Sequence, residues 1–263
     1  MNLIAVAKSA LNQYRNIRDI RAALSDLKAE ELKPPIESTL RSKMPPSLQQ
    51  IERRRRLLLE DFRVIERVDY GAGAPTDSLS LEEQARGRTL KSTVAAAASA
   101  SKPKTWATLF YHLTRQKKPV KALEMGTCVG ISGAYIATAM SELGAGHLYT
   151  LEGDPAVADI ATETFKTLGL GDRVTVVKGR FSDTLPSVLE RGPFDLVYID
   201  GHHDGAATIG YFEQIYPHLS PKAVVIFDDI RWSEGMLGAW KNIASRPGLI
   251  AQDMGGVGYV SLR

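Results

Sequence analysis

Beyond Pro119 the chain alternates between short apolar runs and stretches with the periodicity of amphipathic helices. The apolar runs predict five strands, at Val120–Met125, His147–Glu152, Val174–Lys178, Phe194–Asp200 and Ala223–Asp228. The stretches between them predict helices at Ser132–Leu143, Ala156–Leu168, Thr184–Arg191 and Ala206–Leu219. Strands that alternate with helix-length segments require right-handed crossovers, so the fold class is α/β with a doubly wound, mainly parallel sheet.

The C-terminal region continues this pattern and then changes it. A helix is expected at Glu234–Ala244, followed by two strands, Leu249–Asp253 and Gly258–Leu262, around a glycine-rich turn. So short a connection allows only antiparallel pairing. We therefore expect a hairpin at one edge of the sheet, which brings the number of strands to seven.

The front of the chain is predicted to be helical. Apolar residues at three- and four-residue spacing indicate one helix from Asn2 to about Lys33, ended by Pro34 and Pro35, and a second from about Ser47 to Val68. Gly71–Ser80 is expected to be a loop or hinge, Ser80 and Glu83 resemble a capping box, and a further helix is expected from Thr105 to about Gln116. Residues 1–100 thus form a predicted helical extension that serves as a lid or a dimer contact, and residues 101–263 form the main domain.

Composition limits the class of protein. The 263 residues are 44% hydrophobic, which suffices for one sizeable core. The single cysteine, Cys128, cannot form an internal disulfide, so a reducing cytoplasm is expected, and no apolar run is long enough to span a membrane. A mitochondrial transit segment is an alternative for the N-terminus, which has no acidic residue before Asp19, although acidic residues then continue on the same helical pattern.

Charge is distributed unevenly. Residues 1–118 hold 22 Lys and Arg against 13 Asp and Glu, whereas residues 119–263 hold 11 against 17. Arg53–Arg56 cover more than one helical turn, so they cannot all share one face. We expect a solvated helix with local ion pairs to Glu52 and Glu60 rather than a nucleic-acid site, because no aromatic residues interleave with the arginines.

The candidate chemistry follows the first predicted strand. Ligands of an open parallel sheet bind outside the carboxyl ends of its strands. The loop there reads EMGTCVGIS, with Glu124, Gly126, Cys128, Gly130 and Ser132, and its glycines allow a close approach of the backbone to a ligand. The glycine spacing differs from the G-x-G-x-x-G of dinucleotide sites, which disfavours a nicotinamide cofactor. Cys128 is interpreted as a small loop residue and not as a nucleophile.

The next two strands end in residues suited to a nucleoside. Glu152 could accept hydrogen bonds from two ribose hydroxyls, while Asp154, before Pro155, suits the start of a helix. Gly179, Arg180, Phe181 and Ser182 could surround a flat ring such as adenine.

Acidic residues follow the fourth and fifth strands. If those strands are neighbours, Asp200 and either Asp228 or Asp229 converge at the carboxyl edge, where an oxygen-only cluster suits Mg²⁺ or another hard divalent cation. The alternative is that Asp228 and Asp229 cap a helix and orient a loop.

This order of motifs resembles the class I S-adenosylmethionine-dependent methyltransferases, and more narrowly the catechol and caffeoyl-CoA type O-methyltransferases and their bacterial relatives. The resemblance covers about Lys102 to the C-terminus. It implies that the loop from Glu124 to Ser132, with Thr127, holds the methionine part of the cofactor, that Glu152 holds the ribose, and that Gly179–Asp183 borders the adenine. It also implies a Rossmann-like sheet that carries the terminal hairpin.

The resemblance further implies a metal at Asp200, Asp228 and Asp229 in cation-dependent members. His203 stands where the family often has a lysine base, and a histidine can accept a hydroxyl proton near neutral pH. His202 is adjacent, so the identity of the base stays open. Trp106, Tyr111, Trp232 and Trp240 are candidates for a substrate wall, with core packing as the alternative for each.

The expected function is O-methylation of a small-molecule hydroxyl, in which the oxygen attacks the sulfonium methyl group, with a divalent metal as a possible aid. The alternatives are an RNA or protein methyltransferase that uses the basic front, a nicotinamide-dependent oxidoreductase, and a non-catalytic binding protein. Nucleic acid is not the expected partner, no membrane association is expected, and the front helices could form a homodimer.

Overall fold

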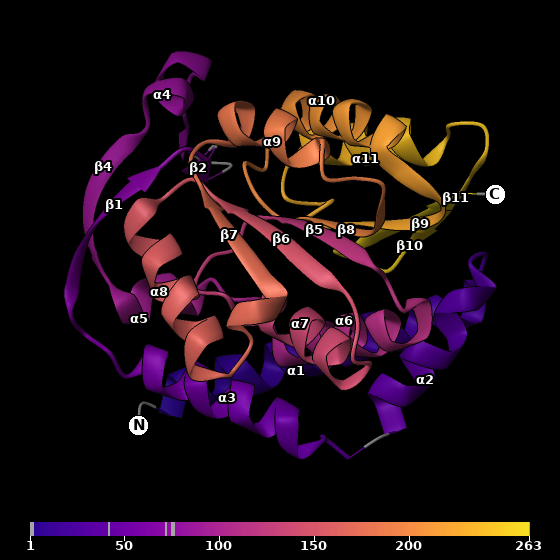
Figure 1. Cartoon of the computed structure of the whole chain (residues 1–263), viewed down its shortest axis with the longest axis horizontal. Coiled ribbons are helices and arrows are strands. Elements are labelled where there is room, and N and C mark those ends of the chain that lie inside the picture. The colour runs from indigo at the N-terminus through magenta and orange to yellow at the C-terminus, as the bar shows by residue number, and fades with distance from the viewer. Residues whose placement is uncertain (1–2, 42, 72, 75–76, 263) are drawn as a thin grey trace.

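The computed structural model describes residues 3–41, 43–71, 73–74 and 77–262. A seven-stranded sheet lies at the centre between two layers of helices (Figure 1). Its strands are β5 (Lys121–Met125), β6 (His147–Glu152), β7 (Val174–Lys178), β8 (Phe194–Ile199), β9 (Leu219–Phe227), β10 (Leu249–Asp253) and β11 (Gly258–Leu262). No helix in the described part of the chain is long and apolar enough to cross a membrane.

The strand order is β10-β11-β9-β8-β5-β6-β7. The five strands from β9 to β7 pair in parallel, and β11 pairs antiparallel with both β9 and β10. The predicted doubly wound sheet, its seven strands and its terminal hairpin are thereby confirmed. The order reverses between β5 and β8, which is where ligands bind in sheets of this kind.

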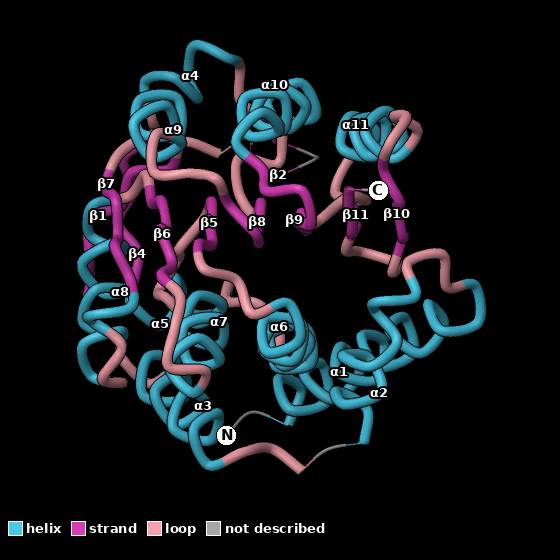
Figure 2. Tube along the Cα trace, turned by 45° about the vertical axis from the view of Figure 1, so that its right-hand side comes forward, coloured by secondary structure: helices cyan, strands magenta, loops and turns pink. Residues whose placement is uncertain are grey.

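Helices cover both faces of the sheet (Figure 2). One face carries α6 (Lys104–Lys117), α7 (Ile131–Glu142) and α8 (Pro155–Thr167), and the other carries α9 (Phe181–Leu189), α10 (Gly205–Ile215) and α11 (Glu234–Ala244). Side chains alternate across the sheet, so that in β5 Ala122 joins the core beneath α6 and α7 while Leu123 and Met125 join the core beneath α9 to α11.

The front helices differ from the prediction. α1 (Leu3–Ala23) ends ten residues before Lys33, and two short 3₁₀ turns, Leu24–Asp26 and Glu30–Leu32, connect it to α2 (Lys33–Arg41). Pro34 and Pro35 therefore lie in the first turn of a helix and do not end one. A proline is tolerated there because the N–H that it lacks has no partner within the first turn.

The second predicted helix is also shorter than expected. α3 (Pro46–Leu59) is followed by β1 (Val64–Asp69), which pairs antiparallel with β4 (Arg88–Thr93) from Val64↔Thr93 to Asp69↔Arg88. The β-branched residues Val64, Ile65 and Val68 suit a strand, but their partner strand lies more than twenty residues further along the chain. Local periodicity could not reveal this pairing, and the prediction of helix to Val68 was wrong.

The region between β1 and β4 contains small elements. The two-residue strands β2 (Gly73–Ala74) and β3 (Asp77–Ser78) pair within the predicted loop Gly71–Ser80, of which residues 72 and 75–76 lie outside the described residues. α4 (Leu81–Arg86) begins at the predicted capping box, with Ser80 and Glu83 bonded reciprocally. α5 (Val94–Ser99) follows β4 directly. We call β1, β4 and the described residues between them the ribbon.

The extension thus has two parts with different positions. α1, α2 and α3 pack below α6 and α7, and their buried residues Ile20, Ile36 and Ile51 belong to the same core as Tyr135 of α7. The ribbon instead rises past α8 toward the carboxyl edge of the sheet (Figure 1). The helices therefore support the domain from below, whereas the ribbon reaches the predicted site.

Other element boundaries are close to expectation. Both hairpin strands and the helix Glu234–Ala244 match the predicted ranges, α9 begins three residues earlier than predicted, and α10 ends four residues earlier. Pro217 and a 3₁₀ turn, Tyr216–His218, end that helix and direct the chain into β9. Two of the four consecutive arginines have partners: Arg55 pairs with Glu52 as predicted, and Arg54 pairs with Glu163 of α8.

Candidate active site

A cavity of about 520 Å³ opens at the carboxyl edge of the sheet, where the strand order reverses. This volume falls within the usual range of small-molecule and cofactor sites. Predicted residues among its lining are Gly126, Cys128, Glu152, Arg180, Phe181, Ser182, Asp200, His202 and His203. The structure thus brings together the residues that follow four different strands.

Gly126 allows the loops after β5 and β8 to meet. Its φ is +101°, and a Cβ at this position would lie 1.7 Å from the carbonyl oxygen of Asp200. Only glycine fits so close an approach in a left-handed conformation. The contact places Cys128 and Asp200 on one cavity wall.

Glu124 lies beneath this wall and not in it. Its carboxyl group is completely buried and accepts hydrogen bonds from Ser132 Oγ (2.6 Å) and Thr150 Oγ1 (2.7 Å). Burial raises the pKa of Glu124 to about 7, against the opposing effect of these two hydrogen bonds. Glu124 therefore holds the loop from inside.

The remaining loop residues have similar supporting positions. Thr127 is buried, with its hydroxyl 2.6 Å from that of Thr150. Gly130, at φ +86°, precedes α7, and a Cβ there would crowd Ala161 of α8. Gly179, at φ +136°, lies close to the Thr184 side chain. The structure places none of these three among the cavity-lining residues, nor Glu124 or Ser132.

Glu152 faces the cavity from the end of β6. Oε2 accepts the Cys128 N–H (2.8 Å), and Oε1 accepts the Asp154 N–H (2.9 Å). Burial is the largest cause that raises the pKa of Glu152 to about 7, ahead of the nearby charge of Asp154. Each oxygen can accept one more hydrogen bond, so the carboxylate is fixed by the backbone and still available to hydroxyl groups.

The backbone N–H of Cys128 has a larger role in the site than its thiol. Its φ is +49°, its N–H binds Glu152, and its Sγ lies 3.4 Å from the Ala97 carbonyl oxygen of α5. Burial, with the Glu152 carboxylate, raises the pKa of the thiol to about 12. The thiol is therefore protonated near neutral pH and is a poor nucleophile.

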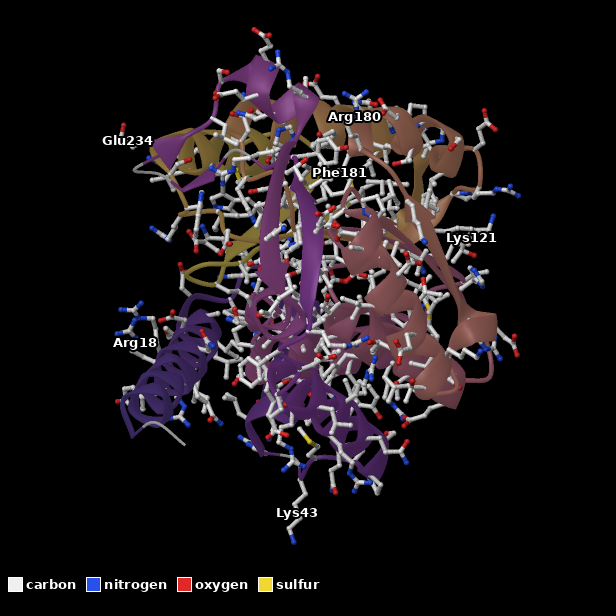
Figure 3. All side chains as sticks on the ribbon, turned by 90° about the vertical axis from the view of Figure 1, so that its left-hand side faces the viewer. Arg18, Lys43, Lys121, Arg180, Phe181 and Glu234 are labelled. Carbon is white, nitrogen blue, oxygen red and sulfur yellow. The ribbon has the colours of Figure 1, made fainter. Side chains whose placement is uncertain are left out.

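The ribbon closes one side of the cavity through three contacts. Arg67 Nε binds Asp154 Oδ2 (2.9 Å), Arg180 Nη1 donates to the Ala85 carbonyl oxygen of α4 (2.7 Å), and His202 Nε2 lies 2.6 Å from Gln84 Oε1. Figure 3 looks onto the ribbon, with Arg180 and Phe181 beside its upper end. Asp154 also caps α8 as predicted, because its Oδ1 accepts the Ala156 and Val157 N–H groups.

His202 is fully engaged in this closure. Gln84 Nε2 donates to the Leu79 carbonyl oxygen, so Oε1 faces His202 and the imidazole proton belongs on Nε2. Nδ1 then accepts the Tyr211 hydroxyl at 2.7 Å. Burial lowers the pKa of His202, and both ring nitrogens have partners. Among the described residues, the adjacent His203 has no comparable hydrogen bonds, and it also lines the cavity.

His203 lies between an acid and an aromatic ring. Its Nε2 is 3.9 Å from Asp229 Oδ2, and its ring centroid is 5.6 Å from that of Trp232. Of the four aromatic wall candidates only Trp232, 40% exposed, lies beside the site, whereas Trp106, Tyr111 and Trp240 are buried in the core. Packing is therefore the role of those three.

Left-handed backbone is concentrated here. Among the described residues five non-glycine positions have positive φ, and four of them are Cys128, His202, His203 and Asp229. Positive φ is uncommon outside glycine, although His and Asp adopt it more readily than most residues, and such conformations cluster at active sites. Their concentration makes this edge of the sheet a candidate functional site.

The predicted group of Asp200, Asp228 and Asp229 is not assembled as three free carboxylates. Asp228 Oδ1 accepts the Asp229 N–H (2.8 Å), and Oδ2 accepts the Tyr198 hydroxyl (2.6 Å) and forms an ion pair with Lys102 Nζ. Within the described ranges, Asp200, His203 and Asp229 instead place one potential ligand atom each within 4.8 Å of one another. The donor set for a cation therefore lacks Asp228 and includes His203, so it does not fit the predicted all-oxygen cluster.

Several site residues were not predicted, namely Lys102, Arg67, Tyr70, Gln84, Tyr198 and Tyr211. Tyr198 could have been found, because it precedes Asp200 by two residues and so shares its side of the strand. Lys102, Arg67, Tyr70 and Gln84 come from segments before β5, and no local pattern connects them with the sheet edge.

The strand order with its antiparallel terminal hairpin, and a cavity at the switch point, define the class I methyltransferase fold. A family model described as a methyltransferase domain matches residues 123–230 of the chain.

Known proteins agree with this assignment. Catechol O-methyltransferase of Mycobacterium tuberculosis is 35% identical over 117 residues, which are 44% of this chain and 51% of that protein. Catechol O-methyltransferase of Niastella koreensis is 33% identical over 41% of this chain and 48% of that protein. The chain spans about half the length of these curated relatives.

Solved structures extend the likeness in fold. An O-methyltransferase of Bacillus cereus in complex with S-adenosylhomocysteine (SAH) gives a TM-score of 0.57 at 21% identity, covering 86% of this chain and 94% of that one. An SAH-bound methyltransferase of Podospora anserina gives 0.62 at 17% identity, covering 86% and 92%. These similarities include most of the chain and concern the fold.

Proposed function

We propose that the protein is an S-adenosylmethionine-dependent O-methyltransferase that acts on a small hydroxylated molecule of the phenolic type. The observation that carries this proposal is Glu152, a cavity-facing carboxylate fixed by two backbone N–H groups beside the Gly126–Cys128 loop. The relatives named as catechol O-methyltransferases support the reaction class and the phenolic acceptor.

The cofactor would lie across the β5, β6 and β7 ends. Glu152 would accept the ribose hydroxyls, the loop from Gly126 to Cys128 would hold the methionine part, and Phe181 would border the adenine. Arg180 has a supporting role in this arrangement, because its guanidinium is held by Asp183 and by the Ala85 carbonyl oxygen. Glu124, Thr127, Gly130, Ser132 and Gly179 would shape the loops that contact the ligand.

S-adenosylmethionine, when bound, supplies a methyl group on a sulfonium. In the reaction the acceptor oxygen forms a bond to that methyl carbon while the carbon–sulfur bond breaks, its electron pair stays on sulfur, and the hydroxyl proton is lost. We assign the proton to His203, which faces the cavity, and the orientation of the acceptor hydroxyl to Asp200. The Trp232 ring beside His203 suits a planar acceptor.

Incubation of the full chain with labelled S-adenosylmethionine and a panel of catechols, monophenols, RNA and protein acceptors tests the function. We expect label to be transferred to a phenolic hydroxyl. Transfer to RNA or protein alone, or binding of the cofactor without transfer to any acceptor, would contradict the proposal.

The base assignment has its own test. His203→Ala should lower kcat by about 10² to 10⁴-fold with little change in cofactor affinity, because general-base catalysis contributes about this much. The matched control is His202→Ala, which should mainly raise the Michaelis constants by loosening the Gln84 contact. Full turnover by His203→Ala would assign the proton elsewhere.

The N-terminal helices would support α6 and α7, and the ribbon would form a lid over the cavity.

We also propose a homodimer through α1 and α3, because Tyr14 and Leu57 on these helices are 69% and 57% exposed. Light scattering on the purified chain would test it, with a dimer mass expected and a monomer mass contradicting it.

A further inference from the structure

A buried lysine lies under the acidic end of the site. The Lys102 side chain is 8% exposed and that of its partner Asp228 is 3% exposed. Lys102 comes immediately before Pro103 and α6, and Arg55 Nη1 of α3 donates to its carbonyl oxygen at 2.8 Å. The lysine is therefore held by the backbone in a fixed position and does not extend into solvent as surface lysines do.

The ammonium group belongs to a hydrogen-bonded chain that ends in the cavity. Lys102 Nζ pairs with Asp228 Oδ2, which also accepts the Tyr198 hydroxyl at 2.6 Å. The same hydroxyl oxygen lies 2.5 Å from Oδ2 of Asp200, a cavity-lining residue. Lys102 is thus connected through two groups to the residue that we place against the acceptor.

We propose that Lys102 provides, as a covalently attached cation, the positive charge that a divalent metal ion would otherwise supply to this carboxylate cluster, so that methyl transfer by this protein needs no metal. This inference rests on the proposed function. It assigns Lys102 as a positioning residue, because it acts through Asp228 and Tyr198 and is not placed against the substrate.

Charge balance supports the assignment. Carboxylates so close together need a cation among them, or one of them must remain protonated. Lys102 Nζ is in direct contact with Asp228 Oδ2, and the Tyr198 hydroxyl connects Asp228 with Asp200. The ammonium group is therefore placed as the cation among these carboxylates.

Geometry also disfavours a metal at Asp228. Both of its oxygens already accept hydrogen bonds, so a divalent ion would have to displace the Lys102 ammonium and leave it buried without a partner. Of the remaining donors, Asp200 is already connected to this ion pair, because its Oδ2 lies 2.5 Å from the Tyr198 hydroxyl oxygen that donates to Asp228.

The first experiment titrates the full wild-type chain with Mg²⁺ alone and with Mn²⁺ alone by calorimetry, and compares its Tm with and without chelator. We expect no saturable binding at millimolar metal and the same Tm in both buffers. A single saturable site that disappears in Asp229→Asn would overturn the proposal, because a metal would then bind beside Lys102.

The second experiment removes the Lys102 charge and measures whether Mg²⁺ binds in its place. Lys102→Met keeps the length of the side chain and removes its charge, so Mg²⁺ should now bind about tenfold or more tightly than in the wild type and raise the Tm accordingly. Lys104→Met is the matched control, since Lys104 is exposed at the start of the same helix. Lys102→Met that folds and gains no affinity for Mg²⁺ would contradict the proposal.

The proposal remains testable if Lys102→Met fails to fold, because the wild-type titration needs no variant. Lys102→Arg offers a second variant that keeps the charge, and it should remain insensitive to Mg²⁺. Metal binding by a wild-type protein that still transfers methyl groups would overturn this inference alone. Absence of methyl transfer with no metal binding would instead overturn the proposed function.

Discussion

The two halves of the candidate site neutralise buried carboxylates in different ways. On the side of β5 and β6, Glu124 and Glu152 are held by hydroxyl and backbone N–H donors, and burial raises the pKa of each to about 7. On the side of β8 and β9, Asp228 is paired with an ammonium group that keeps its pKa low, while burial and the Asp228 charge raise the pKa of Asp200 beside it. Neutral donors leave a carboxylate free to change its charge near neutral pH, whereas a fixed cation holds the charge constant.

The largest effect should come from breaking the ion pair on the β8–β9 side. Asp228→Asn leaves the Lys102 ammonium buried without its ion-pair partner and should cost about 3 to 5 kcal/mol of unfolding free energy, measured by denaturant unfolding. Asp229→Asn, at the neighbouring and more exposed position, is the control and should cost much less. If Asp228→Asn is as stable as the wild type, the ion pair does not stabilise the β8–β9 side, and the two halves do not differ in this way.

The β5 side should respond to pH. A carboxyl group whose pKa is raised on folding binds its proton more tightly in the native state, so unfolding free energy falls as pH rises from its unfolded pKa of 4.5 to about 7. For Glu124 this loss should be on the order of 3 kcal/mol. Glu124→Gln should abolish the part of this pH dependence that is due to Glu124. Unfolding free energies measured by chemical denaturation at pH 5 and at pH 8 test this. Equal slopes in the variant and the wild type would show that Glu124 does not titrate in this range.

Cofactor binding should depend on pH through Glu152. With a pKa of about 7, the fraction of Glu152 in the carboxylate form increases about tenfold from pH 6 to pH 8, and SAH should bind up to about tenfold more tightly at the higher pH. Calorimetry on Glu152→Gln should show weak binding with no such dependence. A pH dependence retained in that variant would assign it to another group.

The smallest effect is expected at Cys128. Its N–H positions Glu152, but its thiol only contacts the Ala97 carbonyl oxygen, so Cys128→Ala should change cofactor affinity less than about twofold. The thiol, with its pKa raised to about 12, should also react slowly with iodoacetamide at neutral pH. Rapid alkylation of the folded protein would contradict the buried position of the sulfur.

The same two halves explain what the sequence could predict. Glu152 and Asp200 each come at the end of a predicted strand, so the rule that ligands bind at the carboxyl ends of parallel strands was enough to place them at one edge. Glu124 was assigned to the same ligand loop, but the structure buries it beneath that loop. The terminal hairpin was predicted in the same way, from a short connection between two apolar runs.

The rest depends on contacts between segments that are distant in sequence. Lys102 precedes Asp228 by more than one hundred residues, and β1 was predicted as helix because its partner β4 is not adjacent. Pro34 and Pro35 were interpreted as a helix end, although proline suits a helix start equally well. Local patterns therefore predicted the sheet and its cofactor side, while the ribbon and the buried cation required the tertiary structure.

In the proposed function the cavity binds the methyl-donor cofactor through Glu152, and calorimetric titration of the full chain with SAH is the direct test. We expect the wild type to bind in the micromolar range and Glu152→Ala to bind about tenfold or more weakly, the loss expected from a charge-assisted hydrogen bond. No binding by the wild type, or equal affinity in the two proteins, would contradict it.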